Sequence, residues 1–344
     1  MRMKNKLITN SFDNHYRSEF RYTAVIRTLG TAGEKYQILL DSLCRQTVQP
    51  DQILVYIPEN YELPKETCGR EKYIRCQKGM VHQRSLSFDE VKTEWILFCD
   101  DDISLNPESV SLLWDGLSRY QNSQCISPDV FPNSQASMSA KIKNCILGTK
   151  PHYKKEWAFI IRESGYYSYN NLSEKKRSDV LRTQSAAGAC CLISKKAYLS
   201  IHFEDERFLD DFKYALGDDI LFYYKLYRMG FQPLVHYKSG IVHLDGGTSH
   251  IINKKEKIKM SNAALYTVWH RSLYSVSSGL LRKLWCGFCY WNMVIITFLL
   301  ILGKGIIKLN PLTSFVYLSG VLYGIKYTCK EKYKNLPGFM SYKN

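Results

Sequence analysis

Short apolar segments alternate with helix-like segments over the first hundred residues, and this alternation constrains the fold more than any other feature. Residues 22–27, 53–57 and 95–99 are apolar runs of strand length, whereas residues 34–46 and 82–91 have helical spacing of apolar side chains. Alternating strands and helices predict an α/β fold with a mixed, mostly parallel sheet flanked by helices. In open sheets of this kind, ligands bind beyond the carboxyl ends of the strands.

Three consecutive aspartates, Asp100, Asp101 and Asp102, directly follow the apolar run that ends at residue 99. Side chains alternate across an extended backbone, so Asp100 and Asp102 would point the same way and could share one cation, while Asp101 faces elsewhere. Carboxylates suit Mn²⁺ or Mg²⁺, which keep positions open for substrate phosphates. Aspartate clusters also occur in turns, in helix caps and on solvated surfaces, so the cluster alone leaves both interpretations open.

A second acidic pair, Asp218 and Asp219, follows Gly217 and precedes an apolar and aromatic run of helical length at residues 220–229. Both are candidate catalytic residues. A carboxylate at a helix start accepts hydrogen bonds from free backbone N–H groups, so we expect Asp218 to cap the helix. The other carboxylate would project into a cleft, and we assign the role of general base to Asp219.

Residues 185–189, Ser-Ala-Ala-Gly-Ala, form a stretch of small side chains before an apolar segment at residues 190–193. Small side chains would let a bulky ligand approach the backbone closely. They would equally let a helix and a sheet pack closely.

The composition favours a globular protein with anionic partners. Of the 344 residues, 45% are hydrophobic, which is enough for one large core or two smaller ones, and the formal net charge is +15. The basic residues occur in short scattered groups, so we expect no nucleic-acid groove. Residues 1–22 are polar and charged, without an apolar export segment, and we expect the 11 cysteines to be mostly free thiols in a reducing compartment.

The C-terminal part contains two uncharged stretches. Residues 284–303 would reach the thickness of a bilayer core at ~1.5 Å per helical residue, whereas residues 309–325 are shorter and include Pro311. Flanking basic residues favour both ends on the cytoplasmic side. Lys304 and Lys308, in the connection, argue against a spanning hairpin, so shallow in-plane attachment and a buried soluble helix are alternatives.

The order of several short motifs resembles that of family 2 glycosyltransferases, which have the GT-A fold. The motifs are Arg27-Thr28, Leu-Cys-Arg-Gln-Thr at 43–47, Gln83-Arg84, Phe-Cys-Asp-Asp-Asp at 98–102, Ala-Gly-Ala at 187–189, Asp-Glu-Arg-Phe at 205–208 and Gly-Asp-Asp at 217–219, where the family usually has Gly-Glu-Asp. The resemblance covers about residues 20–250 and depends on the order, spacing and strand context of the motifs together.

This resemblance implies a GT-A catalytic domain at residues 21–255, with a donor half at about 21–105 and an acceptor half at about 106–255. Residues 1–20 would be an N-terminal extension, and residues 256–344 a helical, membrane-associated region.

The resemblance also implies roles for individual residues. Asp100 and Asp102 match the acidic motif that binds the metal and the nucleotide ribose, and Asp219 matches the base. Arg84 matches a position that contacts the donor nucleotide or its phosphates, although it could equally be a surface ion-pair partner. His243 resembles a histidine that reaches the metal or the diphosphate, and it could equally be a packed strand histidine.

The remaining implied contacts with the nucleotide sugar come from Arg27, Thr28, Ala187 and Gly188. Three tyrosines, Tyr166, Tyr167 and Tyr169, could stack on sugar faces, but half-buried strand positions are the favoured interpretation.

The implied activity is metal-dependent sugar transfer with inversion, from a nucleoside diphosphate donor to a lipid-linked or oligosaccharide acceptor. It would contribute to surface polysaccharide biosynthesis on the cytoplasmic face of the membrane. A processive polysaccharide synthase is an alternative, but such enzymes carry a Gln-x-x-Arg-Trp motif of which Trp269-His-Arg271 is only a partial match. A catalytically inactive membrane-surface binding protein is the other alternative.

Overall fold

The structure is a computed structural model that describes residues 20–130, 144–145, 147, 151–213, 216–244 and 254–343. The expected N-terminal extension therefore lies outside the described residues, except for Phe20.

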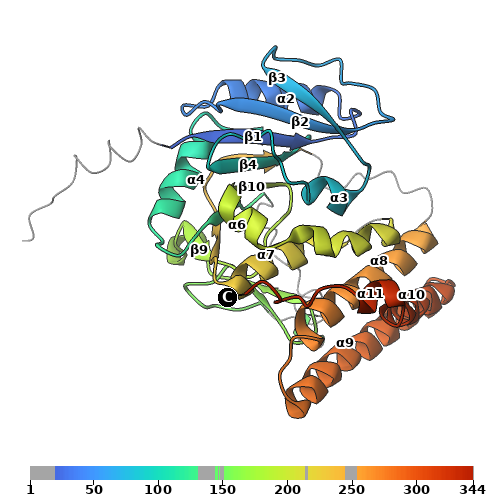
Figure 1. Ribbon diagram of the computed structural model, residues 1–344. Helices are drawn as coiled ribbons and strands as arrows, with labels where there is room; N and C mark the ends of the chain where they lie inside the picture. Colours follow the sequence, from blue (N-terminus) through green and yellow to red (C-terminus); the bar gives the residue numbers. More distant parts are fainter. Residues whose placement is uncertain are drawn as a thin grey trace, which may run out of the picture.

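A mixed eight-stranded sheet forms the centre of the described part of the chain (Figure 1). The strand order is β3-β2-β1-β4-β10-β6-β11-β9. In chain order the strands are β1 (Tyr22–Arg27), β2 (Gln52–Pro58), β3 (Glu71–Cys76), β4 (Trp95–Asp100), β6 (Cys125–Pro128), β9 (Val180–Arg182), β10 (Cys190–Ser194) and β11 (Pro233–His236). Only β10 and β9 run antiparallel to their neighbours in this sheet as described, so the expected α/β fold with a mixed, mostly parallel sheet is confirmed.

Helices cover both faces of the sheet. The described helices are α2 (Glu34–Cys44), α3 (Met80–Arg84), α4 (Ser109–Ser118), α6 (Lys195–Ser200), α7 (Asp218–Met229), α8 (Lys254–Trp269), α9 (Leu280–Ile307), α10 (Leu312–Thr328) and α11 (Glu331–Lys334), with a 3₁₀ segment η2 (Phe203–Phe212) and a π-helical turn η3 (His270–Tyr274). Alternate residues of β1 face opposite layers: Ala24 and Ile26 pack with α2 and α4, whereas Val25 packs with α6, α7 and α8. The sheet is therefore buried on both sides.

Helix α3 is shorter than the expected helix at residues 82–91 and ends at Arg84. Its first turn is capped from elsewhere in the chain, because Asp210 accepts hydrogen bonds from the backbone N–H groups of Val81 and His82, each at 2.9 Å. Beyond the helix, Phe88 adopts a φ of 50°, which an α-helix does not allow.

The C-terminal helices share a core with the sheet. Ala263 of α8 and Tyr327 of α10 belong to the same buried cluster as Val25. Helix α10 packs closely on α8, because a Cβ atom at Gly320 would lie 2.4 Å from the carbonyl oxygen of Lys259 and one at Gly324 would lie 2.8 Å from that of Ala263. The buried core therefore continues across the expected boundary between residues 255 and 256.

Helix α9 is the one helix in the described residues that is long and apolar enough to cross a membrane. It contains the uncharged stretch at residues 284–303 and lies at the end of the molecule opposite β3 (Figure 1). One side is buried against α8 and α10, at Cys286, Tyr290, Met293 and Val294. Its other side exposes large apolar residues, namely Leu280, Leu281, Leu284, Trp285, Phe288, Trp291, Ile295, Leu299, Ile306 and Ile307.

Candidate functional site

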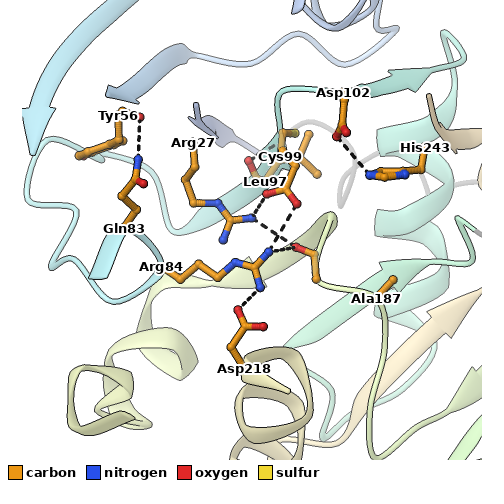
Figure 2. A network of polar contacts seen from close by, with 12 residues as sticks. Arg27, Tyr56, Gln83, Arg84, Leu97, Cys99, Asp102, Ala187, Asp218 and His243 are labelled. Carbon is orange, nitrogen blue, oxygen red and sulfur yellow. Dashed lines mark hydrogen bonds and ion pairs between the residues drawn. The ribbon is translucent and has the colours of Figure 1, made fainter. Parts of the chain in front are cut away.

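Two arginines meet at the carboxyl ends of the central strands. Arg27 ends β1 and is the register partner of Asp100, whose Oδ1 accepts a 2.6 Å hydrogen bond from its Nη2. Arg84, at the end of α3, donates from Nη2 to the other oxygen of Asp100 at 3.4 Å. Both guanidinium groups also donate to the carbonyl oxygen of Gly188 at 3.3 Å. Arg27 and Arg84, from the first hundred residues, therefore contact the backbone of the small-residue stretch at residues 185–189. Figure 2 shows the two arginines side by side, with Asp218 below Arg84.

The glycine at position 188 leaves space for Arg84. A Cβ atom added to Gly188 would lie 2.7 Å from Nη1 of Arg84, which is closer than real Cβ atoms approach. Gly188 therefore lets the side chain of Arg84, the last residue of α3, approach the backbone closely. Ala187 accepts a 3.3 Å hydrogen bond from Tyr223 through its carbonyl oxygen.

Asp218 does not cap helix α7, contrary to expectation. The N-cap residue is Gly217, and the Asp218 carboxylate instead forms a close ion pair with Nη1 of Arg84 (Figure 2). Burial by itself lowers the pKa of Arg84, but Asp218 and Asp100 outweigh it and raise this pKa. Asp218 is thus a partner of the arginine, because burial of an unpaired guanidinium would be unfavourable.

Asp219 lies next to this pair, and its Oδ1 accepts a 2.8 Å hydrogen bond from the backbone N–H of Ile220. Burial, together with the negative charge of Asp218, raises the pKa of Asp219 to about 7. A carboxyl group with a pKa near neutrality can gain or lose a proton under physiological conditions.

The three aspartates at the end of β4 have different partners, and Asp100 pairs with the two arginines. Only Asp100 belongs to the strand, since residues 101 and 102 form a turn, and the expected alternation therefore ends at Asp100. Asp101 accepts a short hydrogen bond from the hydroxyl of buried Thr28, while burial raises its pKa to about 6. The Oδ1 atom of Asp102 lies 3.2 Å from the Nε2 atom of His243 (Figure 2). We expected Asp100 and Asp102 to share one cation. These contacts do not favour that arrangement, because the two carboxylate oxygens of Asp100 are paired with Arg27 and Arg84.

Asp102 and His243 fit a divalent cation better. The pairing of β5 (Ile103–Leu105) with β12 (Ile241–His243) places His243 opposite Ile103, directly beside Asp102. Carboxylate oxygen and imidazole nitrogen are both ligands of Mn²⁺, and substrate phosphates commonly complete such sites. No group of three or more His, Cys, Asp or Glu side chains suited to a metal occurs among the described residues. The described residues therefore provide two candidate ligands at this position.

Asp219 lines three neighbouring cavities. The first, of about 20 Å³, lies between Arg27, Arg84 and Gly188, and it is large enough for roughly one water molecule. The second, of about 70 Å³, is lined by Ala187, Tyr167 and Tyr169. The third, of about 400 Å³, extends to α8, α9 and α10. Asp219 thus lies between the cavity at the arginine pair and the cavity at the C-terminal helices.

The sequence did not identify the residues that hold Arg84 in place. Besides Asp210 at the start of α3, the Tyr198 hydroxyl donates to the carbonyl oxygen of Arg84 at 3.0 Å. Arg207 donates to the backbone carbonyl of Ser85 at 2.8 Å and to its hydroxyl at 2.7 Å. Arg207 lies within the Asp-Glu-Arg-Phe motif at 205–208, which was the available signal.

No protein-family model matches the chain, and no curated protein matches its sequence.

Proposed function

We propose that the protein is a metal-dependent, inverting glycosyltransferase with the GT-A fold. It moves a sugar from a nucleoside diphosphate donor to a lipid-linked or oligosaccharide acceptor at the cytoplasmic face of a membrane, in surface polysaccharide biosynthesis. One observation carries the proposal: Arg27, Arg84 and Asp219, from three separate elements, line the same cavity at the carboxyl ends of β1 and β4.

The arginines supply the contacts that a diphosphate needs. The buried Nε of Arg27 has no hydrogen-bond partner among the described residues, so this side chain retains a free donor. Phosphate oxygens would replace Asp218 and Asp100 as acceptors from Arg84, and such charge-assisted hydrogen bonds are strong. Asp102 and His243 would hold Mn²⁺ or Mg²⁺, and a bound cation neutralises negative charge on a leaving diphosphate.

Asp219 is the proposed general base. It would take the proton of the acceptor hydroxyl as that oxygen attacks the anomeric carbon from the face opposite the diphosphate, which inverts this centre. Its pKa of about 7 suits proton transfer at neutral pH. Asp218 assists indirectly, because its charge raises the pKa of Asp219 and its ion pair positions Arg84 before the donor binds.

The test is release of nucleoside diphosphate from a panel of uridine, guanosine and thymidine diphosphate sugars, in the presence of Mn²⁺, Mg²⁺ or EDTA. We expect metal-dependent release from one donor. Asp219→Asn should lose this release but still bind the donor in calorimetry. The control is Asp179→Asn, which should match the wild type because Asp179 is an exposed carboxylate that forms an ion pair with Lys238.

Three other outcomes are informative. If no nucleotide sugar binds in the presence of metal, the proposal is wrong and a membrane-surface binding protein is the better description. If Asp219→Asn turns over normally, Asp219 is not the base. Addition of many sugars in one encounter would identify a processive synthase.

A further inference from the structure

The cavity of about 400 Å³ next to Asp219 is formed jointly by the sheet-bearing part of the molecule and the C-terminal helices. Its volume is within the roughly 300–1,000 Å³ that is typical of ligand pockets. It is the largest of the three cavities that Asp219 lines, and the arginine pair does not line it.

The chemistry of the lining differs between its elements. Tyr167 and Tyr169 of β8 (Tyr167–Tyr169), which also line the cavity of about 70 Å³, contribute hydroxyl groups near Asp219. The C-terminal helices contribute mainly apolar and aromatic side chains, namely Leu265 and Val268 from α8, Tyr290 and Met293 from α9, and Tyr317 and Val321 from α10. No charged side chain other than Asp219 belongs to the described lining. A long apolar group would be favourably buried here.

Helix α9 separates this cavity from an exposed apolar surface. Met293 and Thr297 line the cavity, whereas Ile295 and Leu299 are on the outward side and are each 56% exposed. An apolar surface of this size is typical of a membrane contact. A ligand in the cavity would thus lie one helix away from the surface proposed to contact lipid.

We propose that this cavity holds the apolar chain of a lipid-linked acceptor and thereby selects such an acceptor over a soluble oligosaccharide. The inference rests on the proposed function. The acceptor oxygen forms a bond to the anomeric carbon, the bond from that carbon to the diphosphate breaks, the nucleoside diphosphate leaves, and the acceptor proton passes to Asp219. A soluble oligosaccharide would leave the apolar side chains that line this cavity without an apolar partner.

The test uses farnesyl phosphate and isopentenyl phosphate, which share a head group and differ in chain length. Binding is measured in detergent, with uptake by empty micelles subtracted. We expect the wild type to bind farnesyl phosphate about tenfold or more tightly than isopentenyl phosphate, because the longer chain buries more apolar surface. Equal affinities would overturn the proposal.

Two tryptophan substitutions on α9 locate the binding site. Thr297→Trp fills the cavity and should abolish the preference for the longer chain, whereas Ile295→Trp, on the exposed side, should keep it. If Thr297→Trp does not fold, Val321→Phe provides the same comparison from α10. A preference that survives in both folded cavity variants would place the chain elsewhere and overturn the proposal.

Donor binding separates this inference from the proposed function. The cavity variants should bind the nucleotide sugar as the wild type does, because the arginine pair does not line this cavity. Loss of chain binding with intact donor binding supports the inference. Chain binding without any donor binding would refute the proposed function and would leave only a lipid-binding cavity.

Discussion

Asp219 must be ionised to accept a proton, and its surroundings oppose ionisation. Burial and the nearby Asp218 raise its pKa to about 7, so at lower pH the carboxyl group is protonated and cannot act as a base. We therefore predict that turnover rises with pH, is half-maximal near pH 7 and becomes constant roughly one pH unit higher. Initial rates of diphosphate release at saturating donor measure this profile.

Asp219→Asn should lower turnover by ~10²–10⁴-fold and remove the rise with pH, since a positioned base contributes about that much. A wild-type rate that does not change across neutral pH would contradict this assignment.

A methyl group at position 188 should disturb Arg84 specifically. In Gly188→Ala, the added Cβ would lie 2.7 Å from Nη1 of Arg84, so the guanidinium must move away from Asp218 and from the proposed diphosphate site. We predict weaker donor binding in calorimetry with thermal unfolding close to that of the wild type. Gly287→Ala is the matched control, because a Cβ atom there has no neighbour within 4 Å. Equal donor affinities in the two variants would show that donor binding does not depend on the position that Gly188 gives to Arg84.

The sequence allowed some of these contacts to be predicted. Arg27 and Asp100 each end a strand that the apolar pattern identifies, so their place at the carboxyl edge of the sheet could be predicted. That their two strands are neighbours could not, because the pattern does not give the strand order. The ion pair of Arg84 with Asp218 joins residues far apart in the chain, and Asp218 was expected to cap a helix because that interaction is local. Tertiary pairing outweighed the local preference.

At the scale of elements, strands were easier to predict than the ends of helices. The strand at residues 95–99 is a short buried run whose apolar character identifies it, and β4 extends only to Asp100. Helix α3 begins where Asp210 accepts its first N–H groups, and that residue lies more than a hundred positions later. A cap supplied from a distance leaves no local sequence signal.

A buried ion cluster connects three elements, and its loss should destabilise the protein. Glu206 of η2 is fully buried and pairs with Lys225 of α7 at 3.0 Å and with Arg271 of η3 at 3.0 Å. Glu206→Ala leaves two buried cations without their shared partner, so we predict a loss of ~3–5 kcal/mol in the free energy of unfolding.

Denaturant titration in detergent measures this loss. Glu204→Ala is the control, because Glu204 is 48% exposed and should contribute less than about 1 kcal/mol. Similar losses of unfolding free energy in both variants would show that the buried ion cluster contributes no more to stability than an exposed carboxylate does.

At the scale of the whole molecule, the exposed side of α9 is the proposed membrane contact. A carboxylate placed there would resist burial in lipid, so Ile295→Asp should bind vesicles roughly tenfold or more weakly than the wild type. Leu63→Asp introduces the same charge at an exposed leucine, at 46% exposure and distant in sequence from α9, and should leave binding unchanged. Co-sedimentation with vesicles measures the bound fraction. Equal binding by both variants would place the membrane contact elsewhere.

The packing of α10 bears on whether the proposed membrane contact of α9 spans the bilayer or lies along its surface. Helix α10 follows α9 after Pro311 and packs closely on α8 through Gly320 and Gly324. Helix α8 begins with a charged segment, Lys-Lys-Glu-Lys at residues 254–257. A spanning α9 would carry the start of α10 across the bilayer, and α8 could follow only by burying these charges in lipid. The described contacts therefore favour in-plane attachment.

In-plane attachment predicts that the connection between α9 and α10 stays on the same side of the membrane as the sheet. Leu309, in this connection, is 93% exposed. When the protein is bound to the outside of sealed vesicles, a membrane-impermeant maleimide should label Leu309→Cys as fully as it does after detergent is added. The wild type provides the background, because Cys329 is already exposed. Protection of Leu309→Cys until detergent is added would instead mean that α9 crosses the bilayer and that α10 leaves α8 when the membrane is present.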